Sequence, residues 1–257
     1  MLPEEADARL RALGLSAGAA AALAAHFEDA ERRGKPGHGW SRIAWLEREL
    51  REHVDPSARP ERLVAEDAFE RWHGRGALGY LTLDAAVRSS LERPPARARL
   101  VVCEATFPTG MLGHWVRRLA DGGLVAVCTA TSPRRLASPF GGPPLTGTNP
   151  LAIGIPSSDG RPVVVDVSPA RATWGDVLRG AATTGDVVPF GGDQAHKAFA
   201  LAVGLQLLVD ALTIEDDHGA VLLVARPESD PVPALRELAA GVRLPGDARE
   251  SDSQADK

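Results

Sequence analysis

The sequence predicts an α/β protein, in which an all-helical front section precedes a sheet covered by helices. Three observations predict this class. Apolar residues recur at helical spacing through residues 4–50. From residue 56 onward, short apolar runs alternate with helical patterns. The apolar content of 44% and the charged content of 25% are those of an ordinary globular protein with a core.

The front section is expected to contain three helices. Residues 4–33 carry two of them, with Gly14 as the stop of the first and Ser16 as the N-cap of the second. The third helix is marked by three apolar residues at the same spacing: Ile43, Leu46 and Leu50.

The remainder is expected to alternate between strands and helices. Strands are predicted at 63–72, 99–103, 124–130, 151–155, 162–167 and 220–225. Helices are predicted at 81–91, 109–119, 195–212 and 233–241, with a short one between 174 and 185. We therefore divide the chain into a helical section (1–60), a mixed α/β domain (61–246) and a charged, disordered tail (247–257).

Composition excludes several function classes. The net charge of −5 disfavours nucleic acid as a partner, because phosphate binding needs a basic patch. No continuous apolar run approaches the roughly 18 residues of a membrane span, and residues 1–10 lack the pattern of a secretory signal. Cys103 and Cys128 lie in apolar surroundings, so we expect reduced thiols and a cytoplasmic protein. The scattered histidines and the absence of CxxC spacing predict no metal site.

The most informative stretch is Gly37-His38-Gly39-Trp40-Ser41-Arg42, which lies between two helical patterns. His38 can exchange a proton near neutral pH, and Arg42 follows one helical turn later. A proton donor beside a guanidinium group suits a substrate whose carboxylate adjoins a carbonyl or imine. A helix N-cap with a surface histidine and a surface arginine explains the same pattern. Rossmann, P-loop and GxSxG motifs are absent.

Further stretches follow in order along the chain. They are Gly76-Ala77-Leu78-Gly79, Gly147-Thr148-Asn149-Pro150-Leu151-Ala152, Pro189-Phe190-Gly191-Gly192, His196-Lys197-Ala198 and Arg243-Leu244-Pro245-Gly246. Together with the stretch around His38, this series resembles the ordered motifs of the malate/L-lactate dehydrogenase family of NAD(P)-dependent oxidoreductases. The resemblance implies a helical section packed on a mixed sheet that is unlike a Rossmann sheet. It also implies a homodimer.

The resemblance also implies residue roles. His38 would donate the proton to the substrate carbonyl or imine, and Arg42 would hold the substrate carboxylate. Further substrate contacts would come from Ser41, Thr148, Asn149 and Lys197. Contacts with NAD or NADP would come from Gly110, Gly147, Asp166, Gly175 and His196.

The departures from the family pattern cluster on the cofactor side. They are Gly37 for a serine, Pro108 for a histidine, Ala170 for a serine, Asp176 for a lysine and Ala198 for a glycine. An aspartate at position 176 would repel a pyrophosphate. The stretch between that aspartate and Val188 is also shorter than in the family.

We therefore carry three functional hypotheses. The first is an NAD(P)H-dependent reductase of a small 2-oxo acid or cyclic imino acid, with Arg171 and Arg179 as phosphate contacts, unless these are ordinary surface arginines. The second is a cofactor-independent acid–base enzyme, such as an isomerase, cyclase, lyase or dehydratase. In it, His114 is a second acid–base candidate, with a core histidine as the alternative. The third is a non-catalytic homologue.

Overall fold

The front of the chain forms the three predicted helices in this computed structural model, which describes residues 1–52, 54–214 and 217–247. They are α1 (Pro3–Ala12), α2 (Ala17–Arg32) and α3 (Ser41–Glu52). Ser16 caps α2 as expected, because its hydroxyl accepts a hydrogen bond from the backbone N–H of Ala19. A short 3₁₀ turn, η1 (Pro36–His38), connects α2 to α3.

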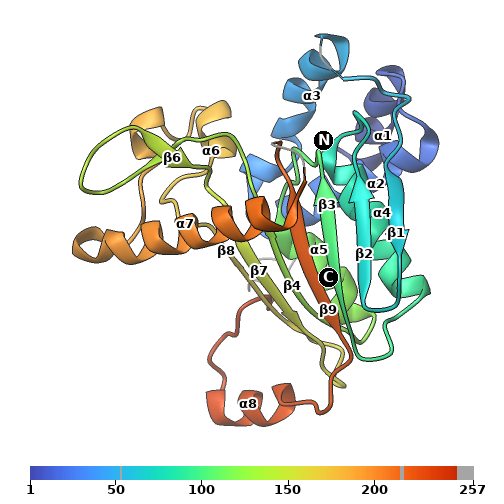
Figure 1. The fold of residues 1–257 in the computed structure, drawn as a ribbon, viewed down its shortest axis with the longest axis vertical. Coiled ribbons are helices and arrows are strands. Elements are labelled where there is room, and N and C mark those ends of the chain that lie inside the picture. The colour runs from blue at the N-terminus through green and yellow to red at the C-terminus, as the bar shows by residue number, and fades with distance from the viewer. Residues whose placement is uncertain (53, 215–216, 248–257) are drawn as a thin grey trace.

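A seven-stranded mixed sheet forms the centre of the molecule (Figure 1). Its strands are β1 (Glu61–Ala65), β2 (Phe69–His73), β3 (Ala98–Glu104), β4 (Val125–Ala130), β7 (Leu151–Ile155), β8 (Val163–Val167) and β9 (Ala220–Ala225). Their spatial order is β1-β2-β3-β9-β4-β7-β8. Only β2 and β3 run parallel; every other neighbouring pair is antiparallel. The predicted α/β class with a mixed sheet is therefore confirmed.

The single strand predicted at 63–72 is wrong. Two antiparallel strands, β1 and β2, occupy this stretch, and the chain turns between them at residues 66–68. The backbone N–H of Glu66 donates to the carbonyl of Phe69 and closes the turn. The adjacent acidic residues Glu66 and Asp67 are the polar interruption that signals this turn.

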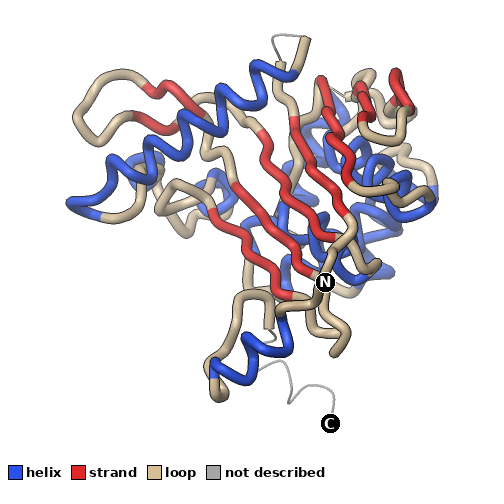
Figure 2. Tube along the Cα trace, turned by 60° about the horizontal axis from the view of Figure 1, so that its bottom comes forward, coloured by secondary structure: helices blue, strands red, loops and turns tan. Residues whose placement is uncertain are grey.

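Helices cover one face of the sheet (Figure 2). The helices on this side are α2, α4 (Gly79–Glu92) and α5 (Leu112–Asp121). The hydrophobic core is continuous, and its residues extend from Ala6 in α1 to Val224 in β9. Because this core crosses residue 60, the front helices and the sheet are stabilised by shared burial. Cys103 and Cys128 lie in the sheet, both buried and both free.

The remaining elements are short strands and helices outside the central sheet and its helical layer, together with the long helix α7. They are β5 (Leu136–Ala137) paired with β6 (Pro144–Thr146), α6 (Trp174–Leu178), η2 (Thr184–Asp186), η3 (Gly192–Gln194), α7 (Ala195–Leu212) and α8 (Val232–Ala239). Figure 2 shows α7 on the side of the sheet opposite the other long helices. The small β5–β6 ladder was not predicted, and residues 248–257 of the predicted tail lie outside the described residues.

Most of α7 is apolar but not buried. Among the described residues, the helical stretch Gly192–Leu212 is the one that is long and apolar enough to cross a membrane, by length and composition alone, and 22% of its most apolar window is buried. Leu207 and Leu208 are 61% and 46% exposed. The absence of a membrane partner therefore stays a prediction.

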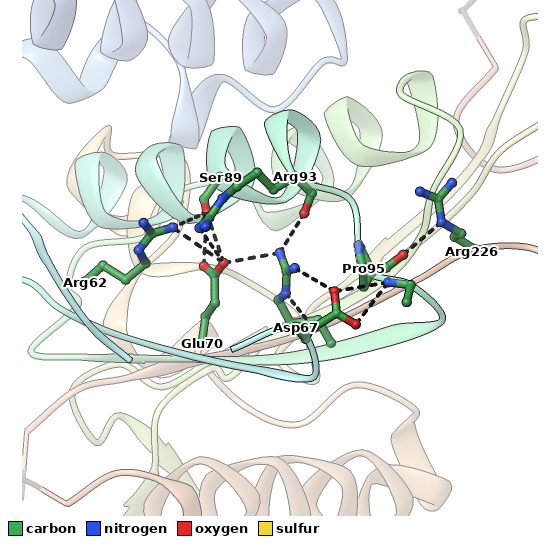
Figure 3. A network of polar contacts seen from close by, with 9 residues as sticks. Arg62, Asp67, Glu70, Ser89, Arg93, Pro95 and Arg226 are labelled. Carbon is green, nitrogen blue, oxygen red and sulfur yellow. Dashed lines mark hydrogen bonds and ion pairs between the residues drawn. The ribbon is translucent and has the colours of Figure 1, made fainter. Parts of the chain in front are cut away.

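A buried carboxylate fastens the β1–β2 edge to α4 (Figure 3). Glu70 is fully buried and accepts hydrogen bonds from the Ser89 hydroxyl and the Trp72 indole. The Arg99 guanidinium, itself 4% exposed, lies 3.2 Å from the same carboxylate. Arg62 and Arg93 approach it from the solvent side at 3.7 and 3.4 Å. A charge this deeply buried is tolerated only because its partners surround it.

Candidate functional site

The loop around His38 opens into a cavity of about 490 Å³. The structure brings six of the sequence-predicted site residues to its wall: His38, Arg42, Gly110, Thr148, Asp166 and Gly175. The wall is built from the η1 loop, the start of α3, the ends of β4 and β8, and α6. Residues that lie more than a hundred positions apart in the sequence therefore face one space.

Local hydrogen bonds shape the loop that carries His38. The Ser41 hydroxyl donates to the Pro36 carbonyl at 2.6 Å, and Glu31 accepts the backbone N–H of Trp40 at 2.8 Å. A Cβ on Gly39 would overlap the Glu31 side chain, so this close approach needs glycine. Ser41 is exposed and outside the cavity wall, so here it closes the turn.

The Arg42 guanidinium is buried without a carboxylate partner. The residue is 8% exposed, and its Nε atom has no hydrogen bond among the described residues. The guanidinium lies over the Trp45 ring, 5.4 Å from its centroid, which holds its plane in place. A buried, unpaired guanidinium is costly, and an anion in the cavity would offset that cost.

Burial and the charge of Arg42 both affect the pKa of His38. Burial, followed by the nearby Arg42 charge, lowers the pKa of His38 from its usual 6.5 to about 4, while Asp166 works in the opposite direction. Although the residue as a whole is half-buried, its Nδ1 atom is shielded and has no hydrogen-bond partner in the part of the chain that the structure describes. The imidazole is therefore neutral at pH 7 in the free protein. An anion that neutralises Arg42 would raise the pKa of His38 and so increase the fraction of His38 that carries a proton to donate.

An ion pair that sequence reasoning missed adjoins His38. The Lys35 ammonium lies 2.6 Å from the Asp166 carboxylate and also donates to the Asp166 carbonyl oxygen. Both residues line the cavity and also a second pocket on the other side of the pair. The Lys35–Asp166 pair therefore forms part of the wall of both the His38 cavity and the second pocket.

The second pocket, of about 310 Å³, is lined by more basic than acidic side chains, although Asp166 and Asp247 also belong to its wall. Arginines contributed by α2, α5 and the segment after α8 line it: Arg32, Arg33, Arg117 and Arg243. Burial, followed by the nearby Arg33 charge, lowers the pKa of Arg117. The motif residues Pro245 and Gly246 also line the pocket, so the Arg-Leu-Pro-Gly stretch was the sequence signal that could have revealed it.

Besides Ser41, five predicted site or acid–base residues lie outside both cavity walls. Asn149 is fully buried, and its side-chain amide donates to Gln206 of α7 at 2.8 Å. Gly147 lies against Ser132, with no room for a side chain. His196 and Lys197 are exposed at the start of α7. Buried His114 pairs with Asp29 at 3.0 Å. The roles predicted for them stay predictions.

Asp176, which differs from the family pattern on the cofactor side, has a local structural role. Asp176 forms a capping box with Thr173 at the start of α6 and pairs with Arg179 at 3.3 Å. Arg179 therefore offsets part of its negative charge, but Asp176 still raises the pKa of His38 in the cavity. Arg171 pairs with Asp186 and lines neither pocket, whereas Arg179 lines the cavity.

Comparisons with known proteins agree with this architecture. The family model described as malate/L-lactate dehydrogenase matches residues 2–191. The chain is 32% identical to (2R)-3-sulfolactate dehydrogenase (NADP(+)) of Chromohalobacter salexigens, over 72% of this chain and 56% of that protein. It is 30% identical to Δ1-pyrroline-2-carboxylate reductase of Pseudomonas fluorescens, over 77% of this chain and 66% of that protein. It thus spans less than two thirds of either relative.

The fold also matches a solved structure over nearly its whole length. Δ1-Piperideine-2-carboxylate reductase of Pseudomonas syringae pvar. tomato superposes with a TM-score of 0.84 at 25% identity, covering 99% of this chain and 92% of that one. The family model matches well over half of the chain, and the shared fold includes the wall of the His38 cavity. This chain belongs to the malate/L-lactate dehydrogenase family.

Proposed function

We propose that this protein is an NAD(P)H-dependent reductase of a small 2-oxo acid or cyclic imino acid. The observation that carries the proposal is the buried, unpaired Arg42 beside His38 in a cavity that adjoins a cationic pocket. The names of the relatives support this reaction class, because they are dehydrogenases and reductases of carboxylate-bearing molecules.

In the proposed reaction, Arg42 binds the substrate carboxylate and fixes the orientation of the adjacent carbon. Burial keeps the pKa of His38 low, but neutralisation of Arg42 removes the next largest cause and so favours the protonated imidazole. His38 then donates that proton to the carbonyl oxygen or imine nitrogen as negative charge develops there. A reduced nicotinamide, when bound, supplies the hydride to the adjacent carbon.

The cationic pocket fits the phosphates of NAD(P)H. Burial, followed by the charge of Arg33, lowers the pKa of Arg117, although Arg33 itself pairs with Asp29 at 3.2 Å, and a phosphate beside Arg117 would stabilise its charged form. Arg243 and Arg32 extend the positive surface. The (2R)-3-sulfolactate dehydrogenase relative carries NADP(+) in its name, which favours NADPH over NADH. The two pockets share Lys35, Met111 and Asp166 in their walls, so one extended cofactor that occupied both would lie against these three residues.

A cofactor-independent acid–base enzyme is the second candidate function. The changes at Pro108, Ala170 and Asp176, which replace the side chains expected on the cofactor side, favour it. In that case His38 and the neighbouring Asp166 would be the acid–base pair of the cavity. The non-catalytic alternative would use Arg42 to bind an anion but would need no proton donor at His38.

Calorimetry with NADPH and NADH tests the first function. We expect micromolar binding of at least one cofactor, and about tenfold weaker binding for Arg117→Ala, because a charged phosphate contact is lost. Arg88→Ala, at an exposed position on α4, is the charge-matched control and should bind normally. Reduction of a 2-oxo acid panel should disappear in His38→Ala. No binding at millimolar cofactor would reject the reductase and leave the acid–base enzyme.

We also propose that the protein is a homodimer. One face of the sheet carries a row of apolar side chains in register across five strands: Leu100, Leu223, Val127, Ile153 and Val165. Leu223 is 44% exposed and the others are no more than half-buried. This row and the exposed leucines of α7 form apolar surface of the kind that a second copy would cover.

A further inference from the structure

A second guanidinium group faces the same cavity as Arg42. Arg135 lies at the start of β5, where its backbone N–H donates to Thr146 of the facing strand at 2.8 Å. The next residue, Leu136, is fully buried. Because successive side chains of a strand point to opposite faces, Arg135 is turned away from that small core and lines the cavity.

An aromatic ring holds Arg135 in position. Its guanidinium carbon lies 3.9 Å from the centroid of Trp174, the first residue of α6. Trp174 and Trp45 both line the cavity, so Arg135 and Arg42 are each stacked on a different tryptophan. Stacking fixes the plane of a guanidinium and leaves its N–H donors free for a ligand.

The two arginines are the cavity cations that have no carboxylate partner. Lys35 pairs with Asp166, and Arg179 pairs with Asp176. Among the described residues, neither Arg42 nor Arg135 forms an ion pair or a side-chain hydrogen bond. Burial, followed by the proximity of Arg42, lowers the pKa of Arg135. The two charges therefore repel each other across a space that one small molecule can fill.

We propose that Arg135 binds a second anionic group of the substrate, so that the protein acts on acyclic 2-oxo acids that carry a carboxylate or sulfonate at the far end. This inference rests on the proposed function, in which Arg42 holds the carboxylate beside the reacting carbon. A dianion neutralises both guanidinium groups, whereas a monoanionic cyclic imino acid leaves Arg135 unpaired. Arg135 is then a specificity-determining residue.

Binding to the cofactor-free protein tests this assignment. The probes form two pairs of equal carbon number: 2-oxoglutarate with 2-oxopentanoate, and malate with 2-hydroxybutanoate. In calorimetry, followed in parallel by tryptophan fluorescence, we expect the better dianion to bind about tenfold or more tightly than its monoanionic partner. Arg135→Ala should abolish this preference, and Arg135→Lys should keep part of it. Arg134→Ala, at the exposed neighbouring position, should keep all of it.

The outcomes separate this inference from the proposed function. Equal affinity for the members of both pairs, or a preference that survives Arg135→Ala, would overturn the role of Arg135. Weaker NADPH binding in Arg135→Ala with an unchanged dianion preference would also overturn it, because Arg135 would then be a cofactor contact. A dianion preference without any NAD(P)H binding would support Arg135 as the second anion site and reject the reductase. Circular dichroism of each variant confirms that the fold is retained.

Discussion

Gly175, at the start of α6, lies so close to Gly37 that a Cβ on Gly175 would overlap the Gly37 carbonyl oxygen. A Cβ on Gly37 would in turn lie 3.0 Å from the Asp176 carboxylate. This contact packs α6 closely against the loop that carries His38, and we expect it to limit the width of the cavity. A serine at position 37 would fit only if these neighbours moved by a few tenths of an ångström.

Gly175→Ala should push α6 away from the η1 loop and widen the cavity. We expect a loss of about 1–3 kcal/mol in the free energy of unfolding, as for other overpacked positions. Anion binding in the cavity should weaken as well, because Trp174 and Arg179 move with α6. Gly185→Ala is the matched control, since the nearest atom to its Cβ would lie 3.6 Å away. Unchanged binding in Gly175→Ala would show that the contact does not set the cavity width.

Histidine NMR titration should give His38 a pKa of about 4 in the free protein. Arg42→Ala should raise that pKa, since a neighbouring cation is lost, and Asp166→Asn should lower it, since a neighbouring anion is lost. A bound 2-oxo acid should raise it in the wild-type protein. The resonance is assigned from its absence in His38→Asn. Shifts of the same sign in the two variants would contradict this electrostatic account.

His26 should make folding stability depend on pH. It is fully buried, and burial, followed by the His114 charge, lowers its pKa well below 6.5. Below pH 6.5 the unfolded chain binds a proton that the folded chain excludes. The stabilisation is therefore complete above that pH and is lost as the pH falls toward the folded-state pKa.

Urea unfolding at pH 7.5 and 5.5 measures this loss. The difference between the two pH values should be smaller in His26→Gln than in the wild type. An amide oxygen at position 26 can still accept the Met111 N–H, which now donates to His26 Nε2 at 3.0 Å. His196→Gln, at an exposed position, should match the wild type. An equal pH dependence in all three proteins would exclude His26 as the cause.

Glu70→Gln should be among the most destabilising single changes in the sheet. It leaves Arg99, 4% exposed, without its buried counter-charge, and breaking such a pair costs about 3–5 kcal/mol. Glu61→Gln is the control, because its ion pair with Arg75 is exposed and such pairs contribute about 0–1 kcal/mol. Denaturant unfolding compares the two. Equal losses would mean that burial does not govern the strength of these pairs.

Leu208→Asp should convert the proposed homodimer into a monomer, because it places a charge on the exposed apolar side of α7. Light scattering after size exclusion gives the mass directly. Leu235→Asp, at an equally exposed leucine of α8, should leave the dimer intact. If the wild type is a monomer at micromolar concentration, the apolar sheet face needs another explanation.

The sequence predicted elements whose residues repeat with a clear period. The helix at 195–212 and the strand at 220–225 were placed to the residue or nearly so. The turn at Glu66 and Asp67 was missed because a strand-like composition continues on both sides of it. The β5–β6 ladder was missed because only two or three residues of each strand pair, within a stretch rich in proline and glycine.

The residues of the candidate site also differ in how far the sequence could predict them. His38 and Arg42 are close in the chain, so one turn of helix relates them, and both line the cavity. Lys35, Arg117 and Arg135 reach the pockets from separate segments. In the sequence an arginine that lines a pocket looks like one that faces solvent, so only the three-dimensional arrangement distinguishes them. The converse holds for Lys197, whose place in a motif says nothing about its exposure.

The position of β9 in the sheet affects how the protein folds. This strand comes from residues 220–225 but lies between β3 and β4, and the residues just before it bond to Thr106 and to Thr131 of the cavity wall. The two halves of the sheet therefore have no direct ladder until more than 200 residues have left the ribosome. Such long-range closure slows folding, because loop entropy is lost before the contacts form. The binding cavity thus depends on β9 indirectly, because the residue just before this strand accepts the backbone N–H of Thr131 in the cavity wall.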